Sequence, residues 1–415
     1  MSIDLSQPST TGTGLVLAAT GAVMAPLALF APLGLAPLLS VAAFLVLVLE
    51  RQRLLRAGRA FKPLAVLLLL LSAWGMLSAS WATLPAHALF EGARFLVISA
   101  SGLVLLAGTL SLPEQARVRI GRWTLIGIVA TMVLAIIELW GNAPLSQAGL
   151  SPGTDILLTR FDRGSTTLTL LLWPALAGAG WKQKAGLILA VLVTTLALES
   201  SAARLAVLVG GAAWGVAWWR PRLVAGGIAA ILLFNAFVLP EIAPDGRAIV
   251  AIHQTAPWLK LSAIHRFGIW NFVADRIHER PLLGWGMDGA RELPGGHADF
   301  ADTLPGTGLP RGSEALPLHP HDAPLQWRVE LGLPGTFLCL AIIGWILWQI
   351  GWRRTCPRGI QALSLAFATT ALPIALLSYG VWQAWWESCL WLAAALMMSV
   401  TPAIENRFGQ ADDRR

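Results

Sequence analysis

The chain has 415 residues, of which 56% are hydrophobic and only 13% are charged. A soluble globular protein usually carries about twice that charged share. Apolar stretches recur along the whole chain, each long enough to cross a ~30 Å hydrocarbon layer as a helix. This composition excludes a soluble enzyme, a disordered tail and a small disulfide-linked domain. It predicts an all-α, polytopic integral membrane protein.

Twelve apolar stretches are predicted to span the membrane. They lie at 14–30, 33–50, 63–80, 95–110, 123–140, 165–180, 185–199, 203–219, 223–239, 325–350, 360–378 and 383–400. The chain is therefore divided into nine spans within residues 1–239, a long loop over 240–324, three further spans within 325–400, and a tail over 401–415. Because single-sequence boundaries are inexact, each end is placed to within several residues.

The short loops rich in Lys and Arg all lie on one side of the membrane in this twelve-span arrangement. They are 51–62, 116–122, 181–184, 220–222 and 352–358. Since cytoplasmic loops carry an excess of Lys and Arg, both termini are predicted in the cytoplasm and the long loop on the opposite face. The net charge of +7 is then a signal of topology. Nucleic acid is not an expected partner.

The long loop has two halves of different character. Residues 258–280 place apolar side chains at helical spacing, which predicts an amphipathic helix that ends before Pro281. Residues 291–320 are rich in Gly and Pro and have no periodicity. That half is either a mobile lid that orders on substrate or a surface linker, because long loops serve both purposes.

The densest polar cluster of the chain lies at the end of the long loop and leads directly into the tenth predicted span. Its members are His319, His321 and Asp322. Pro324 suits the first turn of a helix, where its missing N–H costs nothing. Gln326 and Glu330 lie four residues apart and should share one face of that helix. The N-terminus of the span would then face outward beside two histidines, where it favours an anionic group.

Arginines on the same predicted face could neutralise such an anion. Arg204 lies in the short turn between the seventh and eighth spans, and Arg266 lies in the predicted amphipathic helix. Either guanidinium could instead reach the lipid headgroups. Arg160 and Arg163 add further positive charge, unless they are held in salt bridges by nearby aspartates.

Histidine, arginine and a helix N-terminus together suit one class of reaction. A neutral imidazole can take a proton from a hydroxyl near pH 7, and guanidinium groups bind phosphate oxygens. This favours attack by a hydroxyl on a carbon that carries a phosphate or pyrophosphate leaving group. On the outer face the substrate must arrive already activated, as a lipid-linked pyrophosphoryl sugar does. A zinc site at His319, His321 and Asp322 is the competing interpretation, although this spacing matches no closed tetrahedral pattern.

Four segments resemble motifs of the O-antigen ligase and O-antigen polymerase superfamily. Residues 321–335 resemble its signature H-N/S-x-x-L-Q-x-x-x-E-x-G-x-x-G, with Asp322 where the family has Asn or Ser. Arg266-x-x-x-Trp270 resembles its R-x-x-x-W segment, and residues 280–286 resemble its PLLG-x-G segment. Ser200-x-x-x-Arg204 resembles the S-R/x-x-x-A stretch before its eighth helix. The combination is specific to the superfamily but separates its members poorly.

The resemblance implies a membrane glycosyltransferase with a GT-C-like architecture. Such a ligase moves a polysaccharide from undecaprenyl pyrophosphate to a sugar hydroxyl of lipid A–core in the periplasm, inverts the anomeric centre and needs no metal or other cofactor. Carried over, His321 would activate the acceptor hydroxyl, and Arg204 and Arg266 would hold the pyrophosphate. Supporting roles are assigned to His319, Asp322, Gln326, Arg160 and Arg163.

An O-antigen polymerase, whose acceptor is itself lipid-linked, is the first alternative. A protein O-oligosaccharyltransferase is less favoured because those proteins tend to carry extra C-terminal periplasmic sequence. A lipid or sugar transporter is also less favoured, since transporters usually carry ionisable residues deep in their spans. The expected location is the bacterial inner membrane, with the active site facing the periplasm. The expected partners are the lipid-linked glycan, lipid A–core and membrane lipids.

Overall fold

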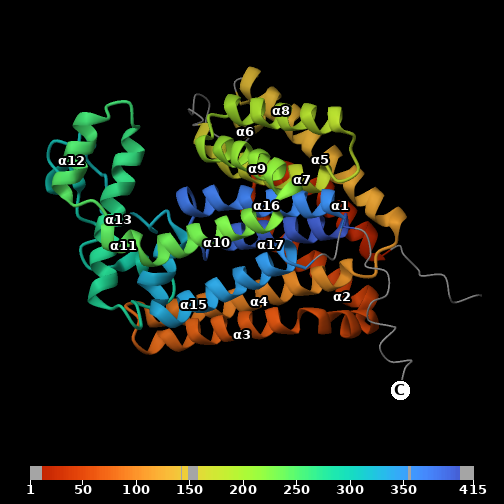
Figure 1. Cartoon of the computed structure of the whole chain (residues 1–415), viewed down its shortest axis with the longest axis horizontal. Helices are drawn as coiled ribbons and strands as arrows, with labels where there is room; N and C mark the ends of the chain where they lie inside the picture. The colour runs from red at the N-terminus through yellow and green to blue at the C-terminus, as the bar shows by residue number, and fades with distance from the viewer. Residues whose placement is uncertain (1–11, 142, 148–157, 354–356, 402–415) are drawn as a thin grey trace, which may run out of the picture.

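A computed structural model describes residues 12–141, 143–147, 158–353 and 357–401. Within these ranges the chain is helical and has no β-strand, and its one strand-like pairing is an isolated bridge between Asp299 and Glu314. Long helices run side by side as a bundle, and the helices of the long loop gather at one end of it (Figure 1). The predicted all-α membrane fold is confirmed. The predicted tail lies outside the described residues except for Thr401.

Each of the twelve predicted spans contains a helix. These are α1 (Gly12–Phe30), α2 (Leu35–Ala57), α3 (Lys62–Leu77), α4 (Pro85–Thr109), α5 (Glu114–Trp140), α7 (Asp162–Ala175), α8 (Trp181–Ala197), α9 (Ser201–Trp219), α10 (Pro221–Phe237), α15 (Ala323–Gly351), α16 (Arg358–Leu377) and α17 (Ala384–Ser399). Short connecting helices are η1 (Pro32–Gly34), η2 (Gly58–Phe61), η3 (Ser78–Ser80), α6 (Pro144–Gln147) and η4 (Leu158–Phe161).

By length and composition, eight helical stretches of the described chain are able to cross a membrane. They correspond to α1 to α5, α9, α15 and α16. The other four helices, α7, α8, α10 and α17, have only 14 to 17 residues. From Gly164 to Ala175, every residue of α7 is buried inside the bundle. A count of twelve crossings therefore stays a prediction.

The long loop folds around a small hydrophobic core that it shares with the first turns of α15. Its helices are α11 (Leu239–Ile242), α12 (Gly246–Thr255), α13 (Leu261–Glu279), η5 (Gly289–Glu292) and α14 (Phe300–Thr303). The predicted amphipathic helix is α13, and it ends before Pro281 as expected. Its buried stripe consists of Ile264, Ile269, Val273 and Ile277, against which Leu293, Phe300 and Leu316 of the Gly- and Pro-rich half pack. The choice between lid and linker for that half stays open.

The helix α15 is broken at Gly332, where φ is 61° and ψ is −157°. Only glycine occupies this backbone region without strain. A Cβ at this position would also lie 2.1 Å from the carbonyl oxygen of Leu282. The break therefore depends on glycine for both conformation and space.

The PLLGWG segment supplies the hydrogen bonds that the broken helix lacks. The N–H groups of Trp285 and Gly286 donate to the carbonyls of Val329 and Glu330, at 2.9 and 2.8 Å. The indole of Trp74, from α3, donates to the Leu331 carbonyl at 3.0 Å. Because buried carbonyls need partners, these bonds fix the first part of α15 to the long loop. Two of the predicted motifs thus bind each other.

Candidate active site

His321 lies in the turn that leads into α15, with its backbone in the left-handed region at φ 52°. Its Nδ1 lies 2.7 Å from the carbonyl oxygen of Ser378. Because a carbonyl can only accept, Nδ1 carries the proton and Nε2 is left as the basic nitrogen. Burial and the nearby Arg266 lower the pKa of His321 to about 4. The ring is therefore neutral at pH 7 and able to accept a proton.

His319 packs beside His321, with 4.3 Å between the ring centroids. Its Nδ1 accepts a hydrogen bond from the backbone N–H of His321 at 3.3 Å. Burial is the main cause that lowers the pKa of His319 to about 3, and the His321, Arg291 and Arg266 side chains lower it further. His319 is thus a second neutral imidazole, and it supports the turn that holds His321.

The helix α13 brings Arg266 and Trp270 to the same place. The Nη2 and Nε atoms of Arg266 donate to the Leu377 carbonyl at 2.8 and 3.2 Å. The indole of Trp270 donates to the Pro320 carbonyl at 3.1 Å. Consecutive carbonyls at the end of α16 therefore bind Arg266 and His321. Arg266 has no carboxylate partner among the described residues, and burial lowers its pKa because the charged form loses hydration.

A second pair of cations meets at the start of α9. Arg204 Nη2 donates to Ser201 Oγ at 2.9 Å, and Lys260 Nζ donates to the same oxygen at 3.3 Å. Lys260 immediately precedes α13, so Arg266 follows it after about 9 Å of helix rise. Neither cation forms an ion pair with a carboxylate in the part of the chain that is described. Arg204, Lys260 and Arg266 are called the cation group below.

Sequence reasoning singled out two members of the cation group and missed Lys260. Its signal was its place at the start of the predicted amphipathic helix. Of the two further arginines, Arg163 lies over the ring of Trp385, at 5.2 Å from the centroid. Arg160 is exposed in η4, and no described contact joins it to His321. The structure therefore brings Arg163 toward the α16–α17 turn but leaves Arg160 apart.

Asp322 is the N-cap of α15. Its Oδ1 accepts the N–H of Leu325 at 2.9 Å, and Pro324 occupies the first turn as predicted. Asn and Ser, the residues of the family motif at this position, are also strong N-caps. The departure from the motif therefore keeps the same local function. Burial raises the pKa of Asp322 to about 7.

Replacing Asp322 by Ala should lower stability by about 1 kcal/mol, whereas Asn should keep the cap. The folded pKa lies above the ordinary value of 3.8. Hence the stability from protonated Asp322 is full below pH ~4 and is lost as pH rises through ~7. Thermal unfolding in detergent between pH 5 and 8 measures this loss, which Asp322→Asn should remove. A wild type with the same pH dependence as the Asn variant would contradict it.

Glu330 is fully buried and joins three segments through its carboxylate. It accepts hydrogen bonds from Gln326 Nε2 at 3.0 Å, from the Asp288 N–H at 3.0 Å, and from the indole of Trp382. Gln326 in turn accepts the N–H of Val381 at 3.0 Å. The prediction that Gln326 and Glu330 share one face of the helix is confirmed, and the two side chains are hydrogen-bonded there. Together, Gln326 and Glu330 connect α15 to the α16–α17 turn and to the loop before η5.

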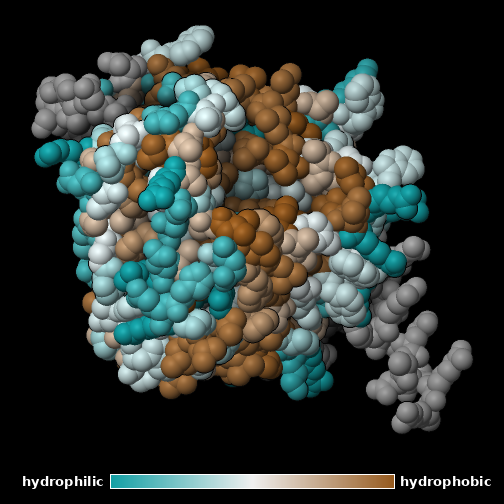
Figure 2. Space-filling view, turned by 60° about the vertical axis from the view of Figure 1, so that its left-hand side comes forward, coloured by the Kyte–Doolittle hydropathy of each residue, from teal (hydrophilic) through white to brown (hydrophobic). Residues whose placement is uncertain are grey.

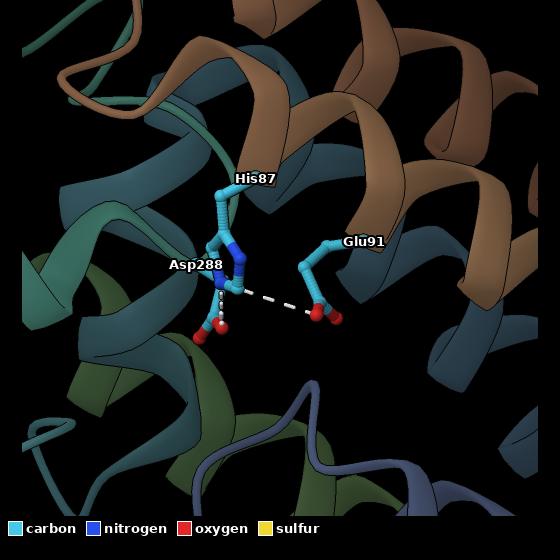
Figure 3. A group of neighbouring side chains, drawn as sticks. All are labelled: His87, Glu91 and Asp288. Atoms are coloured by element: carbon cyan, nitrogen blue, oxygen red, sulfur yellow. Dashed lines mark hydrogen bonds and ion pairs between the residues drawn. The ribbon is translucent and has the colours of Figure 1, made fainter.

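A further polar group was not predicted from the sequence. His87 and Glu91 point from α4 toward Asp288 of the long loop (Figure 3). His87 Nε2 lies 2.8 Å from Asp288 Oδ2 and 3.9 Å from Glu91 Oε1. One ligand atom from each lies within 4.8 Å of the others, so these residues are the described group that could hold a metal ion.

Arginines already pair with both carboxylates of this group. Arg291 Nε donates to Asp288 Oδ2 at 2.7 Å, and Arg94 forms an ion pair with Glu91. Two guanidinium groups beside the carboxylates oppose binding of a further cation. These five side chains, His87, Glu91, Arg94, Asp288 and Arg291, are called the His87 group. It was missed because the fourth span was predicted from residue 95, whereas α4 begins at Pro85.

The chain is similar in sequence to proteins of known families. A family model described as O-antigen ligase matches residues 185–340, from α8 to the middle of α15. A protein of Rickettsia conorii named "Putative polysaccharide ligase" is 29% identical over 71% of this chain and 70% of its own length. A Rickettsia felis protein of the same name is 29% identical over 81% of this chain and 80% of its own. These matches support an O-antigen ligase-type family for this chain.

Proposed function

We propose that the protein transfers a polysaccharide from undecaprenyl pyrophosphate to a sugar hydroxyl of lipid A–core. The observation that carries this proposal is the pairing of His321 and Arg266 on the adjacent carbonyls of Ser378 and Leu377. A neutral base thus lies beside a cation that no described carboxylate neutralises. The likeness to O-antigen ligase-type proteins supports a glycosyltransferase-like ligase that acts on lipid-linked glycans.

The cation group suits the pyrophosphate of the donor. Arg266 and Arg204 offer planar donors, and Lys260 adds a point charge on the same side. The N-terminus of α9, which begins at Ser201, adds backbone N–H groups and a positive dipole end. Charge that develops on the leaving group would be stabilised by these fixed cations without reorganisation of the site.

His321 then acts as the general base. Its Nε2 takes the proton of the acceptor hydroxyl while the hydroxyl oxygen forms a bond to the anomeric carbon of the donor. The bond from that carbon to the pyrophosphate oxygen breaks, and the electron pair leaves with undecaprenyl pyrophosphate. Attack from the side opposite the leaving group inverts the anomeric centre. His319, through its contact with the His321 backbone, positions the base.

The surface of the molecule supports a lipid-linked donor. Figure 2 shows hydrophilic side chains gathered over the end that carries the long loop and hydrophobic ones over the flank of the bundle. A hollow opens between them with a largely hydrophobic rim. A polyprenyl chain would lie along the apolar flank while its pyrophosphate reaches the polar end. The basic short loops favour the periplasmic face of the inner membrane for this end.

The test is ligation by the purified protein in the presence of EDTA. Undecaprenyl-pyrophosphate-linked glycan and lipid A–core are supplied, and the shift of lipid A–core on a gel is measured. Wild type should shift it, and Arg266→Gln should slow the shift by about 10²–10³-fold. Arg311→Gln, which removes an exposed charge from the long loop, should not. Longer lipid-linked chains with unchanged lipid A–core would instead identify a polymerase, and no turnover of either kind would overturn the proposal.

A further inference from the structure

The turn between α16 and α17 orders the polar groups of this end of the molecule. Along the turn, Leu377 binds Arg266 and Ser378 binds His321. Gly380 follows, where a Cβ would lie 3.0 Å from the ring of His319. Along the turn, the contacts to His321 and His319 thus follow the contact to Arg266 of the cation group.

The same turn continues to the His87 group. The carbonyl of Trp382 accepts a hydrogen bond from Arg94. The indole of Trp382 donates to the Glu330 carboxylate, which also accepts the N–H of Asp288. Ser378 and Trp382 are four residues apart, so at most about 14 Å of chain separates them. Electrostatics agrees with this order, because Arg291 lowers the pKa of His319 whereas Arg266 lowers that of both histidines.

The histidine pair therefore lies between two groups of opposite character. On one side are the cations Arg204, Lys260 and Arg266, which have no carboxylate partners among the described residues. On the other side Asp288 and Arg291 neutralise each other at 2.7 Å. The first side suits a pyrophosphate, and the second suits a ligand without net charge.

We propose that His87, Asp288 and Arg291 form the subsite that binds the acceptor sugar through its hydroxyl groups. This inference rests on the proposed transfer reaction and adds the place of the acceptor. Inversion requires the attacking hydroxyl and the leaving pyrophosphate to lie on opposite faces of the anomeric carbon. If the pyrophosphate lies on the cation group, the acceptor lies toward the His87 group, with the base between them.

The donors and acceptors of this subsite match those of neighbouring sugar hydroxyls. The Nη atoms of Arg291 donate to no acceptor among the described residues, and this side chain is 37% exposed. Asp288 accepts at Oδ2 from both His87 and Arg291, which holds all three in place. A hydroxyl group both donates and accepts, so a pair of hydroxyls can bridge a carboxylate and a guanidinium.

The backbone at Asp288 supports a functional role. It lies in the left-handed region at φ 52°, which is uncommon for residues other than glycine, and its N–H is held by Glu330 at 3.0 Å. Such conformations persist where the surrounding structure fixes them, and they cluster at binding and active sites. The Glu330 carboxylate, which fixes this backbone, also accepts the indole N–H of Trp382. Trp382 follows Gly380, the turn residue that lies against His319.

The first experiment is a calorimetric titration of the purified protein with core oligosaccharide released from lipid A. Arg291→Gln should weaken binding by about tenfold, the effect of one lost charge-assisted hydrogen bond. His87→Gln, whose side chain is 34% exposed in the wild type, is the second variant in case Arg291→Gln does not fold. Arg311→Gln is the matched control and should bind as wild type. Equal binding by wild type and both subsite variants would overturn the inference.

The second experiment is kinetic and includes acceptors that lack single hydroxyl groups. Arg291→Gln should raise the KM for lipid A–core about tenfold and leave the KM for the lipid-linked donor unchanged. Removing the hydroxyl that Arg291 binds should raise the wild-type KM similarly but leave that of Arg291→Gln unaffected. A raised donor KM, or equal sensitivity of both proteins to every deoxy acceptor, would place Arg291 elsewhere. Binding without any turnover would retain the subsite while refuting the ligase.

Discussion

His321→Ala is expected to slow polysaccharide transfer by about 10²–10⁴-fold, the usual contribution of a general base. The imidazole is held by Ser378 so that Nε2 is its only free basic nitrogen. The measurement is the initial rate at saturating donor and acceptor. His297→Ala is the matched control, since this histidine is exposed on the same long loop. A His321→Ala variant with more than a tenth of the wild-type rate would exclude His321 as the base.

The pH profile of the same reaction gives an independent check on His321. Burial and Arg266 lower its pKa to about 4, and the proposed base is the neutral form. The acid limb of kcat/KM, which reports the free enzyme, should therefore lie near pH 4. A bound pyrophosphate offsets the charge of Arg266, so the acid limb of kcat should lie higher. Arg266→Gln should move the acid limb of kcat/KM to higher pH. An acid limb at the same pH as in the wild type would contradict this electrostatic coupling.

Gly332→Ala is expected to destabilise the protein by on the order of 4 kcal/mol, from backbone strain and overpacking together. The added methyl group would lie 2.1 Å from the Leu282 carbonyl oxygen. Gly344→Ala in the same helix is the matched control, because no heavy atom lies within 4 Å of its Cβ position. It should change stability by less than about 1 kcal/mol.

Thermal unfolding of both glycine variants in one detergent measures this difference. The expected result is a large fall in the melting temperature of Gly332→Ala and a value near the wild type for Gly344→Ala. Similar melting temperatures for the two variants would show that α15 tolerates a continuous helix at Gly332. That outcome would also show that the contact between α15 and the PLLGWG segment does not depend on a break in the helix.

Much of the fold was accessible from the sequence because hydropathy and periodicity are local signals. Apolar stretches located the twelve long helices, and the stripe of Ile264, Ile269 and Val273 located α13. The cap at Asp322 and the contact of Gln326 with Glu330 follow from spacing along one helix. Such features need no knowledge of the rest of the chain.

The His87 group was inaccessible for the opposite reason. His87 and Asp288 lie 201 positions apart, and only the packing of α4 against the long loop brings them together. Arg266 and His321 are bound by the backbone carbonyls of Leu377 and Ser378. Every residue has a carbonyl, so the residue types at these positions do not reveal the contacts. Hydropathy predicted the fourth span only from residue 95, because polar side chains interrupt the first turns of α4, which begins at Pro85.

The break at Gly332 has a mechanical consequence. Residues 323–331 and the N–H of Leu333 are bonded to the long loop or to the α16–α17 turn, whereas the rest of α15 continues into the bundle. The two halves of α15 thus meet at a joint without a continuous ladder of helical hydrogen bonds. When bilayer thickness changes, we expect the half that continues into the bundle to tilt about this joint, as membrane helices do. The half bonded to the long loop, and His321 ahead of it, would keep their position relative to that loop.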